Sequence, residues 1–400
     1  MVHHVVIAGG GYGGVAALKK LGDVANIKVT LIDQHPYHYL QTEGYALISG
    51  EIPFERTIVS LPALCAYYNN THFEHKRIIY FNRREKKVIC EESELGYDTL
   101  IVAMGSRTKL FKSDKDIRSY SAGAKSLRGA LYLYSLFHEE LYRRLESDKD
   151  INKSFNIIVG GAGLSGVEIA ASMQQFFNRF YRQNALVCSN INIYLIASGE
   201  TVLKGMHKSV IRYATKRLKK LRVNVYTNTR VNTIDKHTAF LSNDEQISFD
   251  FMIFAGGTMI PACLETLDLS SNAKGQLEVD GYLRSVGDEA IYVIGDVASL
   301  SNKKGKPLPP TAQTAIESGS AAAQNIIYKQ QGKKQHRKNV KIKGIAIALG
   351  SGSAVIDMGW IRIYGYLAYV IKNVIEKMYR LPLMWRVYRG YENIDSCKIK

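Results

Sequence analysis

Apolar runs and glycine-rich turns alternate along this chain in a repeated order. Over residues 4–33, the run Val5-Val6-Ile7-Ala8 leads into a Gly-rich turn, a helical pattern and a second apolar run. The same series returns over residues 155–197. Strands that alternate with helices favour parallel sheets with crossover helices. The pattern therefore predicts an α/β fold that contains a loose internal duplication of a nucleotide-binding unit.

Three further apolar runs predict strands outside the duplicated units. Residues 97–105 and 251–257 each close on small residues, as needed where the chain passes close to a cofactor. Residues 291–296 form a buried-strand pattern that ends in Gly295-Asp296. Between the units, residues 114–153 are charged and mostly helical in pattern, most clearly over 127–145. Two segments are predicted to be exposed, namely the loop 302–306 and the strongly basic stretch 329–343.

The pattern changes over residues 359–391. This segment holds both tryptophans of the chain, Trp360 and Trp385, and six tyrosines. Against the lone acid Glu376 stand six basic residues, namely Arg362, Lys372, Lys377, Arg380, Arg386 and Arg389. Pro382 is predicted to divide the segment, because proline cannot continue a helix interior.

Composition narrows the class of protein. The chain has 400 residues, which favours two or three domains, and its 46% hydrophobic and 22% charged residues describe a globular protein. A net charge of +17 favours anionic partners such as a membrane or a cofactor, or reflects a basic solvated surface. We expect no nucleic-acid binding, because no recognition module is visible. No apolar run is long enough to span a bilayer, and the first strand leaves no room for a signal peptide.

The five scattered cysteines argue against metal and disulfide chemistry. Cys65, Cys90, Cys188, Cys263 and Cys397 form no C-x-x-C pair, so neither a zinc site nor a disulfide framework is expected. We expect reduced thiols and no metal.

The first glycine-rich turn has the full dinucleotide fingerprint. Residues 9–14, Gly-Gly-Gly-Tyr-Gly-Gly, contain G-x-G-x-x-G directly after a strand, and Asp33 ends the next strand, 19 residues beyond Gly14. Glycines permit the tight turn and the approach of backbone to a pyrophosphate, and the acid can accept hydrogen bonds from ribose hydroxyls. The alternative is a glycine-rich turn without a ligand.

The second turn keeps the glycines but not the acid. Gly161, Gly163 and Gly166 form the fingerprint, yet the following strand ends in Ala197-Ser198, where an acid is expected. Glu200 lies near but out of register, and Lys204 is the nearest candidate to contact a 2′-phosphate.

Together these motifs resemble the two-dinucleotide-binding flavoproteins of the glutathione-reductase fold, and most of all the type II NADH dehydrogenases. The resemblance runs from residue 4 to about residue 391. It implies two Rossmann-like domains, with non-covalent FAD in the first and NADH in the second. By this resemblance the FAD site would include Gly9, Gly11, Tyr12, Gly13, Gly14, Asp33, Ala103, Gly105, Gly295, Asp296, Ala312 and Gln313, and the NADH site Gly161, Gly163, Gly166 and Gly256.

The resemblance also implies three catalytic candidates. Family members carry A-Q-x-x-x-Q beside the flavin and the quinone pocket, and this chain has Ala312, Gln313 and Glu317 there. Positions 313 and 317 share one helical face. Glu317 is either a buried acid able to give a proton to quinone, or an exposed acid near a helix start. Glu168 matches the family's acid near nicotinamide and flavin, although a helix N-terminus alone also favours an acid.

Related flavoenzymes are excluded by cysteine placement. Disulfide reductases need a redox cysteine pair soon after the FAD loop, and residues 1–64 contain no cysteine. Sulfide:quinone oxidoreductases work through cysteines flanking the flavin, and residues 264–396 contain none. Met104 replaces the threonine that is usual in the family's A-T-G motif, which affects packing more than chemistry.

The resulting prediction is a peripheral membrane flavoenzyme that passes two electrons from NADH through FAD to a membrane quinone without pumping protons. The FAD domain would comprise residues 1–112 and 258–345, the NAD(P)H domain 113–257, and a C-terminal membrane-association segment 346–400. Residues 359–391 would lie on an anionic membrane, at the cytoplasmic face of the inner membrane. That segment could instead pack on the protein's own core or at a dimer contact, and a homodimer is expected.

Two alternatives stay open at this point. Ala197 permits NADPH or another donor. The Glu317 substitution permits a low-turnover flavin redox sensor or scaffold.

Overall fold

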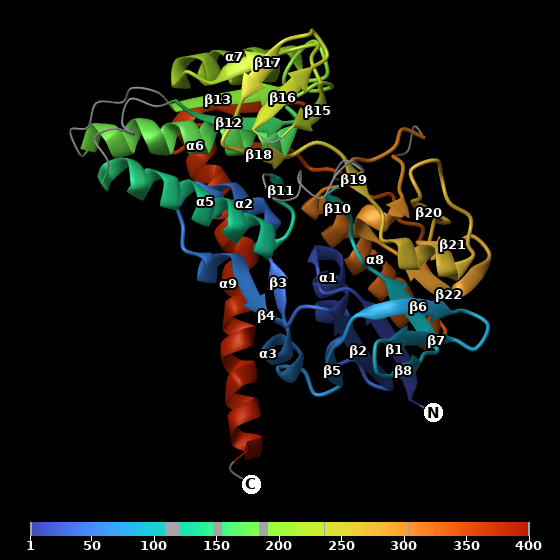
Figure 1. Ribbon diagram of the computed structural model, residues 1–400. Helices are drawn as coiled ribbons and strands as arrows, with labels where there is room; N and C mark the ends of the chain where they lie inside the picture. Colours follow the sequence, from blue (N-terminus) through green and yellow to red (C-terminus); the bar gives the residue numbers. More distant parts are fainter. Residues whose placement is uncertain are drawn as a thin grey trace.

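Two parallel β-sheets, each covered by helices, form the body of the protein (Figure 1). The computed structural model describes residues 2–108, 121–146, 154–183, 191–235, 237–302 and 305–398. The predicted α/β class with two Rossmann-like units is confirmed.

The first sheet has the strand order β21-β22-β9-β1-β2-β5, in which only the edge strand β21 runs antiparallel. Its strands are β1 (His3–Ala8), β2 (Ile27–Asp33), β5 (Thr71–His75), β9 (Thr99–Val102), β21 (Arg284–Ser285) and β22 (Asp288–Val293). Helices α1 (Tyr12–Leu21) and α8 (Ala312–Gln330) pack together beside it. They cross so closely that a Cβ at Gly319 would lie 2.2 Å from the Gly13 carbonyl oxygen. Strands and helices share one apolar core.

The second sheet is fully parallel, in the order β11-β18-β12-β13-β14. Its strands are β11 (Ser121–Gly123), β12 (Phe155–Gly160), β13 (Ile191–Ile196), β14 (Asn224–Tyr226) and β18 (Phe251–Phe254). Alternate side chains of β12 face opposite ways. Ile157 and Val159 join a core with α5 (Leu127–Glu146), α6 (Leu164–Gln183) and α7 (Lys208–Leu221), whereas Ile158 packs against β15 (Val231–Asp235), β16 (Thr238–Leu241) and β17 (Gln246–Ser248).

Smaller elements connect and border these units. The short strands are β3 (Tyr37–Tyr39), β4 (Ile58–Ser60), β6 (Ile78–Asn82), β7 (Lys87–Cys90), β8 (Glu94–Gly96), β10 (Arg107–Thr108), β19 (Thr258–Met259), β20 (Leu277–Glu278), β23 (Ala298–Ser299), β24 (Ile345–Ala348), β25 (Ala354–Asp357) and β26 (Arg362–Tyr364). The short helices are η1 (Gln41–Glu43), α2 (Gly44–Ile48), η2 (Phe54–Thr57), α3 (Leu61–Ala66), η3 (Ala262–Leu267) and η4 (Gly295–Val297).

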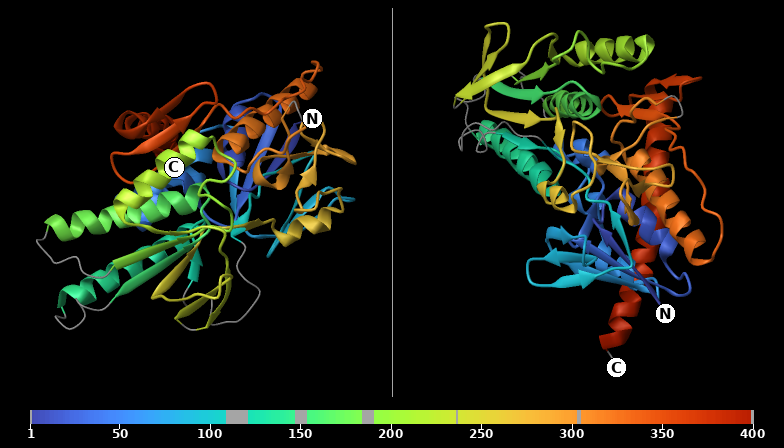
Figure 2. Two further views of the ribbon diagram at one scale, coloured as in Figure 1. Left: turned by 90° about the horizontal axis from the view of Figure 1, so that it is seen from above. Right: turned by 90° about the vertical axis from the view of Figure 1, so that its right-hand side faces the viewer.

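The C-terminal helix α9 (Gly365–Lys398) runs along the molecule, and its end projects beyond the first unit (Figures 1 and 2). The expectation that Pro382 divides this segment is wrong, because the helix continues through it. Proline removes one N–H donor and so leaves the carbonyl four residues earlier without a helical partner. That residue is Met378, which is 70% exposed, so water can reach the region of its carbonyl.

Several other expectations can be compared with the described chain. The predicted helix at 127–145 is α5, and residues 333–344 follow α8 without helix or strand and are mostly exposed. Expected features at residues 114–120, 147–153 and 303–304 lie outside the described residues. No helix in the described part of the chain is long and apolar enough to cross a membrane. The three domain boundaries stay a prediction.

Candidate active site

The first glycine-rich loop joins β1 to α1 and leaves open space beside its centre. Gly9 adopts φ +111°, and a Cβ at Gly14 would lie 1.9 Å from the Gly9 carbonyl oxygen, so both positions require glycine. In contrast, a Cβ at Gly11 would meet no atom within 4 Å. The N–H groups of the first turn of α1 have no partner within the helix. The loop therefore forms a cradle suited to an anionic group.

Asp33 contacts this loop, and a second acid, Asp296, lies in η4 directly after β22. Asp33 accepts hydrogen bonds from the backbone N–H groups of Gly10 at 2.7 Å and His35 at 2.8 Å. Burial raises the pKa of Asp33, although these two hydrogen bonds oppose the shift. Asp296 accepts a hydrogen bond from Ser106 Oγ at 2.5 Å, and Lys125 Nζ lies 3.5 Å from the same carboxylate oxygen. A lysine from the turn between β11 and α5 of the second unit thus reaches the acid that follows β22.

The second loop repeats the geometry of the first. Gly161 adopts φ +113°, a Cβ at Gly166 would lie 1.8 Å from the Gly161 carbonyl oxygen, and a Cβ at Gly163 would meet nothing within 4 Å. In each unit, the first glycine of the fingerprint donates its N–H to a backbone carbonyl near the end of the next strand. The residue after that carbonyl is the position where an acid is expected. Gly9 bonds Ile32 and Gly161 bonds Ile196. Asp33 in the first unit therefore corresponds to Ala197 in the second.

A neighbouring strand end supports each loop from below. A Cβ at Gly9 would lie 2.5 Å from the carbonyl oxygen of Ala103, and one at Gly161 would lie 2.7 Å from Cα of Gly256. Gly105 and Gly295 adopt φ +63° and +69°. The close approach found here is between backbone segments, and the expected approach to a cofactor stays a prediction.

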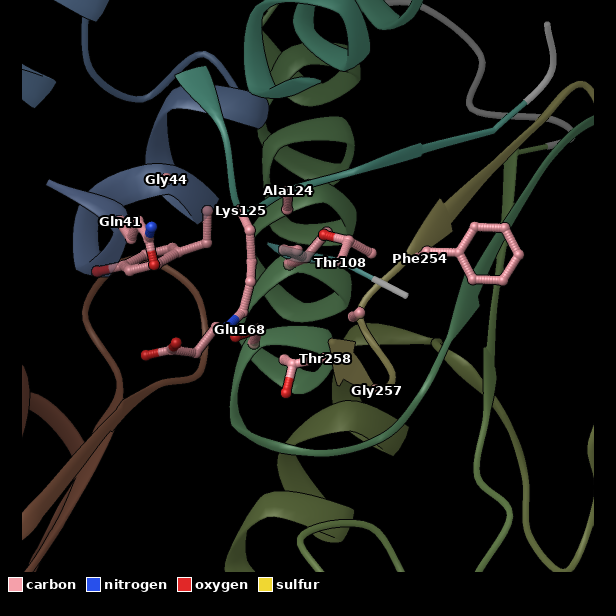
Figure 3. Close-up of a pocket in the computed structure, with 13 residues that line it drawn as sticks. Gln41, Gly44, Thr108, Ala124, Lys125, Glu168, Phe254, Gly257 and Thr258 are labelled. Carbon is pink, nitrogen blue, oxygen red and sulfur yellow. The ribbon is translucent and has the colours of Figure 1, made fainter. Parts of the chain in front are cut away.

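A pocket lined by residues of both units opens between them (Figure 3). The first unit contributes Gln41, Gly44 and Tyr45, and α6 of the second contributes Ser165, Glu168 and Ile169. The remaining lining residues come from β10, from the turn after β11 and from the end of β18 and the residues that follow it. They are Thr108, Ala124, Lys125, Phe254, Ala255, Gly257 and Thr258. Figure 3 shows Glu168, Lys125 and Thr258 among the side chains that line this space, with the Glu168 carboxylate directed away from Thr258. Both nucleotide units thus contribute to one pocket.

Glu168 belongs to a buried charged cluster that includes the C-terminal helix. Its Oε1 accepts a hydrogen bond from the Ala348 N–H at 2.9 Å and lies 4.0 Å from Lys372 Nζ. Lys372 also donates to the Tyr45 hydroxyl at 2.7 Å and pairs with Glu376. Burial raises the pKa of Glu168 to about 7, against the opposing charge of Lys372. Burial alone would lower the pKa of Lys372. The interactions with Glu168, Tyr45 and Glu376 outweigh this effect, so the pKa of Lys372 is raised.

The raised pKa of Glu168 predicts a pH-dependent stability. The folded chain holds this proton more tightly than the unfolded chain, whose reference pKa is 4.5. The resulting stabilisation is fully present below pH 4.5 and is lost as the pH rises through about 7. Thermal melts at pH 4.5 and pH 8 test this. The wild type should lose stability at pH 8 relative to pH 4.5, and Glu168→Gln should lack this loss. The exposed Glu92→Gln should behave as the wild type, and identical profiles for all three would contradict the assignment.

Gln313 and Glu317 lie on α8 and contact a different segment. Gln313 Oε1 accepts a hydrogen bond from the Lys343 N–H at 3.0 Å. Glu317 forms ion pairs with Lys338 at 3.4 Å and Lys343 at 3.5 Å. Both side chains thus hold the basic segment that leads into β24, and the end of β24 contacts Glu168 through Ala348. The quinone-side role of this pair stays a prediction.

Tyr12 connects the first loop to α9. Its ring lies 4.7 Å from the His38 ring and 5.2 Å from the Tyr379 ring, and its hydroxyl lies 2.9 Å from Thr42 Oγ1. His38 Nε2 bonds the Tyr379 hydroxyl at 3.0 Å, and burial lowers the pKa of His38 to about 3, so its ring is neutral. These contacts fix the middle of α9 against the first nucleotide loop.

Two dinucleotide-type loops, in two units that line a common pocket, define the class of the two-nucleotide oxidoreductases. The family model described as pyridine nucleotide-disulphide oxidoreductase matches residues 3–319. The chain belongs to this family. Cys65, Cys90 and Cys263, the cysteines whose surroundings the structure describes, are free thiols.

Curated relatives agree with the resemblance drawn from the motifs. The chain is similar to the NADH dehydrogenase-like protein YutJ of Bacillus subtilis, at 24% identity over 86% of this chain and 90% of the relative. It is also similar to the type II NADH:quinone oxidoreductase of Haemophilus influenzae, at 25% identity over 88% and 86%. Among solved structures, NDH2 from Plasmodium falciparum in complex with NADH matches with a TM-score of 0.87, at 20% identity over 100% of this chain and 98% of that one. The predicted resemblance is confirmed.

The structure brings Glu168 to the shared pocket and places Gln313 and Glu317 outside its lining. Sequence reasoning missed Lys125 and Tyr45, because neither lies in a recognised motif. Lys372 and Glu376 were grouped with the membrane-facing residues of the C-terminal segment, but Lys372 is buried against Tyr45 and Glu168. Their i, i+4 spacing was the available signal, since it favours an ion pair on one helical face.

Proposed function

We propose that this protein is a FAD-dependent NADH:quinone oxidoreductase of the type II class. The observation that carries the proposal is a pocket lined by both nucleotide units, with Glu168 in its wall. The names of the curated relatives point to the same activity. A pocket lined by two nucleotide-binding units is where a hydride donor and a hydride acceptor can meet.

The residues of the first unit fit FAD. The open space beside Gly11 and the free N–H groups of α1 suit a pyrophosphate, and Asp33 and Asp296 are placed to receive hydroxyl groups. Bound FAD would accept a hydride from NADH and pass two electrons to a quinone. Gly9, Gly11, Gly14, Asp33 and Asp296 would hold it. Tyr12, Gly13, Ala103, Gly105, Gly295, Ala312 and Gln313 complete the proposed FAD site.

The charged cluster of this chain would serve proton handling at the pocket. Glu168 has a pKa raised to about 7, so it changes protonation near neutral pH. Lys372 and Tyr45 fix its carboxylate from the side of α9 and α2. Gln313 and Glu317 would border the quinone side, where the ion pairs of Glu317 hold the segment that ends beside Glu168.

The exposed face of α9 supports attachment to a membrane. Seven of its exposed apolar residues recur at helical spacing and form one stripe, namely Leu367, Val370, Val374, Met378, Leu381, Trp385 and Tyr388. Exposed basic residues such as Lys377 and Arg389 lie on the same helix. Such a helix suits the surface of an anionic bilayer. We propose a peripheral position at the cytoplasmic face of the inner membrane, and a homodimer stays a prediction.

Vesicle flotation tests this attachment. Replacing both Met378 and Trp385 by glutamate should lower binding to phosphatidylglycerol-rich vesicles by at least ~10-fold, because each buried apolar side chain contributes about 1.5–3 kcal/mol. The matched control is Ile79→Glu, an exposed apolar residue on β6, which should float as the wild type. Equal flotation of both variants would contradict the proposed membrane face.

Turnover in liposomes tests the activity itself. The FAD-loaded protein, given NADH and a membrane quinone, should form quinol and NAD⁺ in equal amounts. A protein that oxidises NADH without forming quinol would contradict quinone as the acceptor. Complete inertness toward NADH with FAD bound would contradict the oxidoreductase assignment.

A further inference from the structure

We propose that the second nucleotide site accepts NADPH at least as well as NADH, with Lys204 as the contact for the 2′-phosphate. This inference rests on the proposed function, because it names the donor used at the same site. The two nucleotide units, which otherwise correspond closely, differ at one position.

That position is the end of β13. The hydrogen bonds of Gly9 to Ile32 and of Gly161 to Ile196 align Asp33 with Ala197. In the first unit, the Asp33 carboxylate bonds the loop N–H of Gly10 and stands where it can receive ribose hydroxyls. In the second unit, a methyl group occupies that register. The acid that would bind a 2′-hydroxyl, and repel a 2′-phosphate, is therefore missing.

The backbone around Ala197 is fixed rather than free to bring another acid into place. Ala197 donates its N–H to Tyr226 and accepts a hydrogen bond from the N–H of Thr229. Gly199 accepts a hydrogen bond from the N–H of Asn228 at 2.9 Å. The loop after β14 therefore holds residues 197–199 as a continuation of the sheet edge. Glu200, the only nearby acid in this stretch, lies exposed beyond them.

Lys204 is held beside the same edge. The preceding residue, Leu203, adopts φ +52° and donates its N–H to the carbonyl of Ala162 in the second glycine loop at 2.8 Å. The stem of Lys204 then lies over Gly199, where an added Cβ would be 2.9 Å from Lys204 Cδ. Lys204 is thus tied both to the loop that would cradle the pyrophosphate and to the strand end that would face the ribose. The glycine at 199 leaves room for it.

The stretch of sequence that contains this site is also basic, which favours an additional phosphate. From Asn192 to Ile234 the chain carries nine Lys or Arg residues and one acid, Glu200. Lys204 itself is exposed, and no ion pair with another described residue engages its ammonium group. An ammonium group free to approach a phosphate forms a charge-assisted hydrogen bond, which is stronger than the neutral kind.

Binding of adenine nucleotide fragments to the FAD-loaded, full-length protein tests the proposal without relying on turnover. By calorimetry, 2′,5′-ADP should bind ~10-fold or more tighter than 5′-AMP, since a hydrogen bond to a charged group contributes about 1.5–3 kcal/mol. Lys204→Ala should remove most of that difference. Lys219→Ala, which removes an exposed lysine from the last turn of α7, should preserve it. Equal binding of the two fragments by the wild type would overturn the proposal.

Stopped-flow bleaching of the flavin gives the second readout. In the wild type, the second-order rate constant of flavin reduction by NADPH should at least equal that by NADH. Ala197→Asp, which restores the acid of the first unit, should reverse this preference, and Lys204→Ala decides the question if that variant does not fold. Bleaching by NADH alone would overturn this inference and leave the proposed function intact. Bleaching by neither nucleotide would instead contradict the proposed function.

Discussion

Replacing Lys372 by methionine is expected to destabilise the protein by about 3–5 kcal/mol, because it leaves buried carboxylates without their counter-charge. Lys372 is 5% exposed and is the shared partner of Glu168, Glu376 and Tyr45. Methionine matches its stem in volume but supplies neither charge nor donor. Urea unfolding of the FAD-loaded protein should show the loss as a lower midpoint.

The control and the rescue follow from the same helix. Lys377→Met changes an exposed lysine five positions further along α9 and should shift the free energy of unfolding by less than about 0.5 kcal/mol. Adding Glu376→Gln to Lys372→Met removes one uncompensated charge and should recover part of the loss. A loss below about 1 kcal/mol in Lys372→Met would show that the cluster contributes little to holding α9 in place.

Alanine at the two open glycines should separate the two nucleotide sites. Gly11 has φ −75°, and a Cβ at Gly11 or at Gly163 meets no protein atom within 4 Å, so both variants should fold normally. A methyl group that meets a bound pyrophosphate costs about 1–3 kcal/mol, which is about 5- to 150-fold in affinity. Gly11→Ala should therefore lose FAD, whereas Gly163→Ala should keep FAD and bind the nicotinamide nucleotide weakly.

The flavin-to-protein ratio and the nucleotide dissociation constant measure these effects. Gly96→Ala, at another glycine whose added Cβ meets nothing within 4 Å, is the matched control and should retain both. The account would be contradicted if Gly11→Ala retained a full complement of FAD with undiminished affinity. It would also be contradicted if Gly163→Ala lost FAD in place of the nicotinamide nucleotide.

The duplicated nucleotide units could be predicted from the sequence because their signals are local. The run of glycines at 9–14, the acid at Asp33 and the alternating strands and helices all lie within short windows. The position of the missing acid, Ala197, follows from counting along one strand. The hydrogen bonds of Gly9 and Gly161 align this position with Asp33.

The pocket wall could not be predicted in the same way. Tyr45 and Lys372 lie more than 300 residues apart in the sequence, and their hydrogen bond depends on how α9 packs. A basic residue in an aromatic segment fits a membrane surface equally well until that packing is known. The prediction that Pro382 divides the helix failed for a related reason. The cost of the hydrogen bond that proline removes depends on whether water reaches the carbonyl four residues earlier, which the sequence does not show.

The most direct measurement is anaerobic stopped-flow absorbance of the FAD-loaded protein, mixed first with a nicotinamide nucleotide and then with a soluble quinone. We expect the flavin to bleach with the nucleotide and to recover its oxidised spectrum with the quinone, and both steps to persist over repeated cycles. A flavin that stays oxidised with NADH and NADPH, or a bleached flavin that quinone does not reoxidise, would contradict the proposed function.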